Sequence, residues 1–143
     1  MNKIYLTCLL FIASIHSYAQ TPLSLNLICQ INGEITSMSL NGVDTVPIKD
    51  LAMSVLVERG ALSISDGSNY FTNKLPAQIE ENRILGTALW TPKTGEDRSQ
   101  YIEINRNTGM VQVVKTINYS NPTIILKASA SGNCEKLANK KKF

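Results

Sequence analysis

Apolar and polar residues alternate along most of the chain after residue 20. The alternation is clearest over Leu23–Cys29 and Met53–Val57, and Met110–Ile117 is also expected to be a strand. A period of two places successive side chains on opposite faces of a β-strand, whereas the spacing of an amphipathic helix is nearly absent. Ile84–Trp90 is apolar on both faces and is expected to be a central strand. The pattern predicts an all-β protein.

Turn-forming residues separate these segments. Asn-Gly pairs at 32–33 and 41–42 predict two-residue hairpin turns, because both central residues of such a turn have positive φ. The segment 105–109 predicts a longer turn that ends in a glycine, and 66–69 and 91–97 predict loops. About eight or nine strands, spaced by about ten residues, predict a single antiparallel domain that is either barrel-like or a sandwich.

The first 19 residues have the three parts of a cleavable signal peptide. Lys3 supplies a positive charge, residues 4–15 form an apolar run, and Ser17 and Ala19 place small residues before a cleavage site. The apolar run is shorter than the roughly 20 residues that a membrane-spanning helix needs. We therefore expect cleavage near Ala19, no membrane span, and a mature protein that is periplasmic or secreted.

Without the signal peptide 1–19, the chain divides into one β-domain at 20–135 and a Lys-rich tail at 136–143. Residues 20–134 contain nine Lys and Arg against ten Asp and Glu, so the domain is nearly neutral and the basic charge lies in the tail. A solvated terminus is the simpler interpretation of these lysines, although they could also contact an anionic surface. No basic stripe interleaved with aromatic residues is present, so we expect no nucleic-acid partner.

Removal of the signal peptide also takes away one of the three cysteines and leaves Cys29 and Cys134. An even pair in an oxidising compartment predicts one disulfide, with two free thiols or an intermolecular bridge as the alternatives. The bond would join the first mature strand to the last. Because a barrel closes in this way, the pair favours a barrel over a sandwich, although a sandwich can be joined likewise.

The only histidine of the sequence, His16, lies in the signal peptide, so the mature chain has none. This narrows the chemistry that the mature chain can perform. Ser-His-Asp and Cys-His mechanisms are excluded in their usual form, and zinc and copper lose their commonest ligand. The sequence has no Gly-rich phosphate loop and no calcium loop. We therefore expect no cofactor, no metal and no enzyme activity. The alternative is an enzyme that uses carboxylates, Tyr or Lys alone.

Two groups of residues are candidates for binding. The first is a charged loop that could contact a partner protein, made of Thr91, Lys93, Glu96, Asp97 and Arg98. The second is an aromatic set that could line an apolar pocket, made of Tyr70, Phe71, Trp90 and Tyr101. The only tryptophan also has a purely structural interpretation, as a core filler or a plug of the barrel.

Two short motifs carry a resemblance to known proteins. Ile-Asn-Arg-Asn-Thr-Gly stands at 104–109, and Gly-Asn-Cys stands at 132–134. With an early cysteine and an export signal, they resemble small secreted proteobacterial β-proteins of unknown function, in which the hairpin reads Ile-Asp-Arg-x-Thr-Gly. The resemblance implies a compact β-fold and a periplasmic home, and it implies no activity. Size, signal and disulfide also resemble the bacterial lysozyme-inhibitor barrels, whose inhibitory loop has no counterpart that can be placed here.

The sequence therefore predicts an exported, non-enzymatic binding or interaction protein. An inhibitor or immunity-type protein, directed against a hydrolase or a toxin, fits this class, and its partner would be an envelope or extracellular protein. The alternatives are a small-ligand-binding β-barrel, a pilus-like subunit, and a His-independent enzyme. Strand donation in a pilus needs a missing strand, whereas this chain supplies its own first and last strands.

Overall fold

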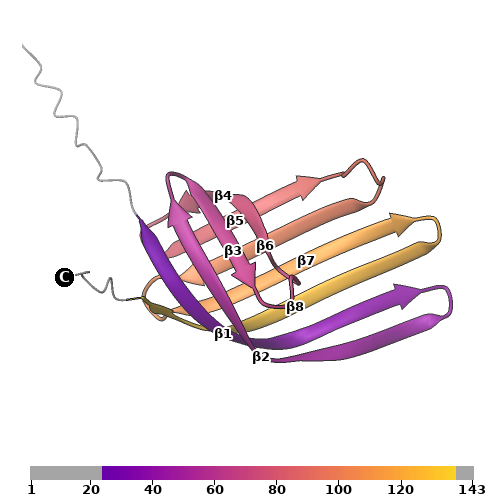
Figure 1. The fold of residues 1–143 in the computed structure, drawn as a ribbon, viewed down its shortest axis with the longest axis horizontal. Coiled ribbons are helices and arrows are strands. Elements are labelled where there is room, and N and C mark those ends of the chain that lie inside the picture. Colours follow the sequence, from indigo (N-terminus) through magenta and orange to yellow (C-terminus); the bar gives the residue numbers. More distant parts are fainter. Residues whose placement is uncertain (1–23, 138–143) are drawn as a thin grey trace, which may run out of the picture.

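The computed structural model describes residues 24–137, in which eight antiparallel strands close into one barrel (Figure 1). Each strand pairs with the next along the chain, and the last pairs with the first. The strands are β1 (Leu25–Ser39), β2 (Gly42–Glu58), β3 (Ala61–Asp66), β4 (Asn73–Ile79), β5 (Arg83–Trp90), β6 (Asp97–Asn105), β7 (Met110–Ser120) and β8 (Thr123–Lys136). This confirms the all-β prediction and identifies the fold as a barrel.

Two predicted segments fall wholly or partly outside this range. The signal peptide at 1–19 lies outside the described residues, as does the part of the Lys-rich tail beyond residue 137. Within the described range, no helix has the length and apolar character needed to cross a membrane.

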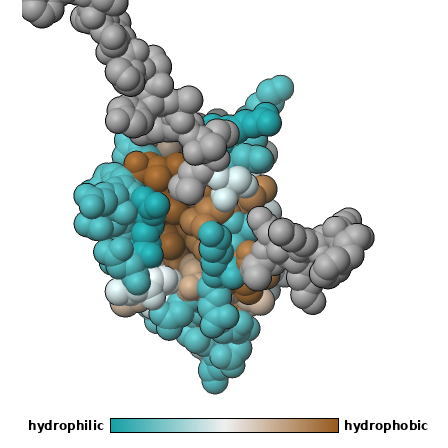
Figure 2. All heavy atoms as spheres, turned by 90° about the vertical axis from the view of Figure 1, so that its left-hand side faces the viewer, coloured by the Kyte–Doolittle hydropathy of each residue, from teal (hydrophilic) through white to brown (hydrophobic). Residues whose placement is uncertain are grey.

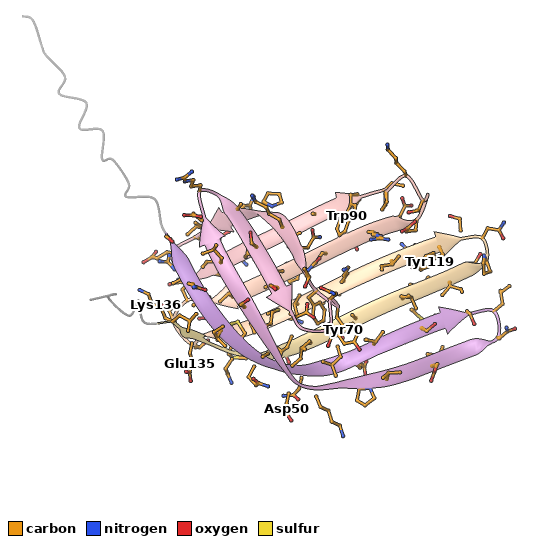
Figure 3. All side chains as sticks on the ribbon, in the orientation of Figure 1. Asp50, Tyr70, Trp90, Tyr119, Glu135 and Lys136 are labelled. Atoms are coloured by element: carbon orange, nitrogen blue, oxygen red, sulfur yellow. A yellow bond between two sulfur atoms is a disulfide. The ribbon has the colours of Figure 1, made fainter. Side chains whose placement is uncertain are left out.

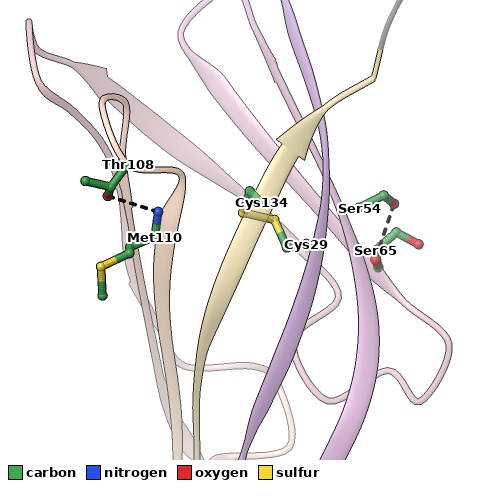
Figure 4. The surroundings of a disulfide bond; sticks show 6 residues. All are labelled: Cys29, Ser54, Ser65, Thr108, Met110 and Cys134. Carbon is green, nitrogen blue, oxygen red and sulfur yellow. Dashed lines mark hydrogen bonds between the residues drawn. A yellow bond between two sulfur atoms is a disulfide. The ribbon is translucent and has the colours of Figure 1, made fainter.

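The barrel is closed by the pairing of β1 with β8. Thirteen residue pairs are in register, from Leu27 opposite Lys136 to Ser39 opposite Ile124. Cys29 and Cys134 stand opposite one another in this ladder and form a disulfide, so that prediction is confirmed (Figure 4). The bond joins residues 105 positions apart. It therefore ties the two ends of the domain together.

The predicted hairpin at Asn32-Gly33 is wrong, because β1 continues through this pair. A Cβ atom on Gly33 would lie 1.9 Å from the carbonyl oxygen of Ser129 on β8. Gly33 is therefore needed for the close approach of two backbones, and not for a turn. The second Asn-Gly pair does lie at a hairpin, but the turn is one residue earlier than predicted. Leu40 and Asn41 are its central residues, and Gly42 already pairs with Ser39.

The hydrophobic core fills the part of the barrel where all eight strands are paired. Every strand contributes at least one buried apolar side chain, among them Ile31, Val55, Leu62, Leu75, Ile84, Ile102, Val113 and Ala130. Phe71, from the loop between β3 and β4, is also fully buried. This part of the interior is thus packed with side chains.

Beyond this core the barrel opens on one side. β3 pairs with β2 only from Met53 onward, and β4 pairs with β5 only as far as Gly86. The longer strands continue as a curved six-stranded sheet in the order β5, β6, β7, β8, β1, β2. It ends in three hairpins that project to the same side (Figure 1). We name these hairpins the arms, and the face that continues the barrel interior the inner face.

Loss of the disulfide should destabilise the domain without changing its fold. In the chain-entropy model, a cross-link that closes a loop of this length stabilises the folded state by about 4 to 5 kcal/mol. We expect the double variant C29A/C134A to keep the β-type circular dichroism spectrum and to lose about that amount in urea unfolding. A reducing agent should lower the stability of the native chain and leave the double variant unaffected. A loss below about 1 kcal/mol would show that the β1–β8 ladder closes the barrel unaided.

Candidate functional site

One hollow lies at the end of the barrel where β1 begins and β8 ends. It has a volume of about 430 Å³ and is lined by Leu25, Leu27 and Ile104 together with the turn 105–109. Figure 2 shows apolar residues gathered in the middle of this end and polar residues around them. Because β1 and β8 lead from here into residues outside the described range, we assign no function to this hollow.

The turn at 105–109 has a structural role. The Asn105 side-chain oxygen accepts hydrogen bonds from the backbone N–H groups of Asn107 at 2.9 Å and Thr108 at 3.0 Å. Arg106 donates from Nη1 to the carbonyls of Glu80 at 2.7 Å and Glu81 at 3.1 Å. The motif therefore fastens the β6–β7 turn to the β4–β5 turn. Asn105 serves as the acceptor that an aspartate could also provide.

A second hollow, of about 240 Å³, lies on the inner face of the open sheet. Its walls are Ile35, Asn69, Tyr70, Lys115, Ile117, Leu126 and Ala128. We name it the inner hollow. Lys115 stands in register between Gln100 on β6 and Ala128 on β8, and Ile117 stands beside Leu126 in the adjacent row toward the arms. In Figure 3, Tyr70 lies near the middle of the molecule, whereas Trp90 and Tyr119 lie toward the arms.

The loop between β3 and β4 supplies the wall that contains Tyr70. Asp66 organises this loop, because its carboxylate accepts hydrogen bonds from the N–H groups of Tyr70 at 3.1 Å and Phe71 at 2.9 Å. Gln100, buried on β6, donates to the Phe71 carbonyl at 2.7 Å and accepts from the Asn73 amide at 3.0 Å. The bonds of Gln100 anchor the loop to β6.

Lys115 is the cation of the inner hollow. Its side chain is partly buried, and it makes no ion pair with any described residue. Burial lowers the pKa of Lys115, and the nearby positive charge of Arg98 lowers this pKa further, whereas Asp66 opposes the shift. An amine that loses hydration without gaining an acidic partner is costly to keep charged.

The predicted partner loop forms the ordered tip of the β5–β6 arm. The Thr91 hydroxyl donates to Asp97 at 2.6 Å, and the Gly95 N–H donates to the Pro92 carbonyl at 3.0 Å. Glu96 is buried and accepts from Arg98 Nη2. The Thr94 hydroxyl, the backbone N–H of Glu96 and Arg98 together lower the pKa of the Glu96 carboxyl.

The other members of this predicted loop differ in exposure. Lys93 at the tip, Thr91 and Asp97 are exposed to solvent. Arg98 lies on the inner face, and its Nε atom is buried and has no hydrogen-bond partner among the described residues. The loop is thus rigid through its own hydrogen bonds, and it offers Lys93 to solvent.

The four residues of the predicted apolar pocket are not gathered in one place. Phe71 is buried in the core, where it plugs the barrel, and Tyr70 lines the inner hollow. Trp90 stands opposite Arg98 on the inner face. Tyr101 lies between two buried neighbours in sequence, so it points to the outer face, where its hydroxyl donates to Glu103. Phe71, and not Trp90, therefore has the role of barrel plug that was considered for the tryptophan.

Among residues 24–137, no strand pairs with β5 beyond Gly86 on the side away from β6, so the open sheet has an edge along β5. The Glu80 N–H donates to the Arg83 carbonyl at 2.9 Å, and the Arg106 N–H donates to the Asn82 carbonyl at 2.8 Å. Since backbone groups alternate along a strand, Thr87 and Leu89 direct theirs away from β6, toward this edge. Continuing the β4–β5 register would place Pro76 opposite Thr87, and proline has no N–H to donate. The Leu89 side chain is 85% exposed.

The opposite edge, on β2, is protected against pairing. The Thr45 N–H is occupied by the Asp44 carboxylate at 2.9 Å, and Pro47 has no N–H. The Asp50 N–H donates to the Asn32 side chain at 2.8 Å. Charged side chains, proline and local hydrogen bonds are the usual means of preventing strand addition. The two edges of the sheet are therefore unequal.

These features define an eight-stranded up-and-down barrel with an open-sided sheet, one free strand edge and a cationic hollow. Among the described residues, no group of three His, Cys, Asp or Glu side chains could hold a metal ion. No protein-family model matches the chain, and no curated protein or solved structure is significantly similar to it. The resemblance to small secreted proteobacterial proteins stays a prediction.

Sequence reasoning missed the inner hollow, although one signal was present. Lys115 occupies an inward position of the alternating run Met110–Ile117, where its neighbours in phase are Val111, Val113 and Ile117. A charged residue at a core-phase position is uncommon and marks a candidate site. The free edge of β5 could not be predicted in this way, because it depends on where β4 stops pairing.

The Glu96 carboxyl should make the β5–β6 arm sensitive to acid. Because its pKa is lower in the folded than in the unfolded state, its contribution to stability is present above the unfolded pKa and is lost as pH falls through the folded pKa. NMR titration should place the Glu96 carboxyl below the ordinary glutamate value of about 4.3. Between about pH 6 and pH 3, E96Q should lose less unfolding free energy than the native chain. An equal loss in both proteins would contradict this assignment.

Proposed function

We propose that this protein is an exported, non-enzymatic interaction protein that binds an extended segment of an envelope or extracellular protein along the free edge of β5. The observation that carries the proposal is the unpaired edge at Thr87–Trp90, with its highly exposed Leu89. In strand addition, backbone hydrogen bonds supply affinity and alternate side chains supply specificity. Leu89 offers both the free backbone groups and an exposed apolar side chain.

The charged arm tip supports the same mode of binding. Thr91 follows the free edge directly, so a strand added to β5 would continue toward the tip at Lys93. Internal hydrogen bonds hold the tip in one conformation, which lowers the entropy lost on binding. An exposed charge beside a backbone ladder adds selectivity and faster association more than affinity. An inhibitor or immunity-type protein would use such a rigid loop.

The protected β2 edge argues against the pilus-like alternative. Head-to-tail strand addition would have to join the β5 edge of one copy to the β2 edge of the next. Thr45 and Pro47 offer no free N–H for that ladder. The proposal therefore concerns a single added strand.

Two further observations support the compartment and the class of protein. A disulfide forms and persists in oxidising compartments, in keeping with the predicted signal peptide. The buried carboxylates of Asp66 and Glu96 accept hydrogen bonds within their own loops, which favours structural over catalytic roles.

Site-specific photo-crosslinking tests the proposed edge. With p-benzoylphenylalanine in place of Leu89, irradiation of cells that export the protein should give an adduct of discrete mass with another protein. The matched control carries the same amino acid at Thr45, on the protected edge, and should give none. Equal labelling at both positions, or adducts only between two copies of this chain, would contradict the proposal.

A substitution at the same position gives the affinity. Against the protein identified in the adduct, L89K should bind at least about tenfold more weakly, because a lysine removes the apolar contact. T45K, on the protected edge, should bind as the native chain does. Because Leu89 is exposed, L89K should unfold at the same urea concentration as the native protein, so the loss can be assigned to binding.

A further inference from the structure

The inner hollow combines an apolar lining with one lysine that forms no ion pair with any described residue. Ile35, Ile117, Leu126 and Ala128 line it, and Lys115 lies among them. A lysine in such surroundings usually has a carboxylate partner or extends its amine to water. Lys115 has no ion-pair partner among the described residues, and its side chain is partly buried.

The acidic groups near this face are engaged elsewhere. Glu96 forms an ion pair with Arg98, the second cation of the inner face. Asp66 accepts hydrogen bonds from its own loop, including one from the Thr72 hydroxyl at 3.2 Å. Asp44 is exposed and caps the Thr45 N–H. None of these described carboxylates forms an ion pair with Lys115, although the charge of Asp66 opposes the fall in the Lys115 pKa. A carboxylate brought by a ligand would therefore be the first to pair directly with this amine.

We propose that the inner hollow binds the anion of a linear aliphatic carboxylic acid, with the carboxylate on Lys115 and the chain along the inner face toward the arms. The register supplies the track for the chain: Ile117 and Leu126 form the next row, followed by Tyr119 and Ile124. The hollow has a volume of about 240 Å³, which is smaller than the roughly 300 to 1,000 Å³ of pockets that enclose drug-sized ligands. Part of the chain therefore lies on the open sheet.

A bound carboxylate would offset the free-energy cost of the partly buried Lys115 charge. A partly desolvated charge destabilises the folded protein until an opposite charge reaches it. The carboxylate would supply that charge, and the aliphatic chain would cover apolar surface that faces solvent. The site lies on the inner face, whereas the proposed strand-binding edge lies beside β5. Either proposal can therefore fail without the other.

Binding of decanoate to the mature, oxidised protein tests the assignment by NMR. Below its micellar concentration, decanoate should shift the backbone amides of Tyr70, Lys115 and Ala128 in a saturable way. Decanol, which has the same chain without the charge, should bind at least about tenfold more weakly. Decyltrimethylammonium should bind no better than decanol. Equal binding of decanoate and decanol, or shifts confined to other parts of the barrel, would overturn the proposal.

Two variants separate the charge from the fold. K115M keeps the length of the side chain and removes the charge, so it should lose the preference for decanoate over decanol. It should also unfold at the same or a higher urea concentration, because the desolvated charge is gone. K127M removes an exposed lysine from β8 and should bind decanoate as the native protein does. Retained preference in K115M would contradict the role of Lys115.

A third variant tests the location independently of charge. A128F places an aromatic ring in the hollow and should weaken binding of decanoate and decanol alike. Native-like binding by A128F would show that the ligand lies elsewhere.

Discussion

The pairing of β1 with β8 is the interaction on which the rest of the molecule depends. Without it the eight strands would form an open sheet with two free ends and no enclosed core. Two glycines allow the approach: a Cβ atom on Gly33 would meet Ser129, and one on Gly132 would lie 1.9 Å from the Gln30 carbonyl. The disulfide then joins the same two strands covalently. Closure, core and register are consequences of one contact between the ends of the domain.

How far the sequence predicts this fold depends on the range of the interactions involved. The period-two pattern predicts the strands because alternation is a local property of the sequence. The cysteine pair predicts the contact between the first and last strands because only two cysteines are available to form a disulfide. The role of Gly33 could not be predicted, since nothing local distinguishes a glycine that allows β8 to approach from one that forms a turn. Tyr101 illustrates the same limit. Its aromatic character suggested a pocket, but the phase of β6 turns it outward.

The candidate site was less predictable than the fold. The loop 91–98 could be recognised from its composition, although the hydrogen bonds that make it rigid could not. The organising residues of the other loop, Asp66 and Gln100, are polar groups whose partners come from different parts of the chain. Lys115 was visible as a charge at an apolar position of the alternating pattern, but its lack of an ion pair among the described residues depends on the neighbouring strands. Such relations become apparent only when the strands are placed side by side.

The lengths of the strands divide the molecule into a closed barrel that contains the core and an open sheet that extends beyond it. β3 and β4 are short, so they complete the barrel only around the core, and the loop between them covers one end of that core with Phe71. The other six strands continue past this point with a face and two edges that the fold itself does not use. A sheet exposed in this way invites unwanted pairing, and the chain prevents it on β2 but not on β5. If the open sheet were only a by-product of unequal strand lengths, protection of one edge alone would have no physical reason. The asymmetry is consistent with the proposal that β5 pairs with a strand of a partner.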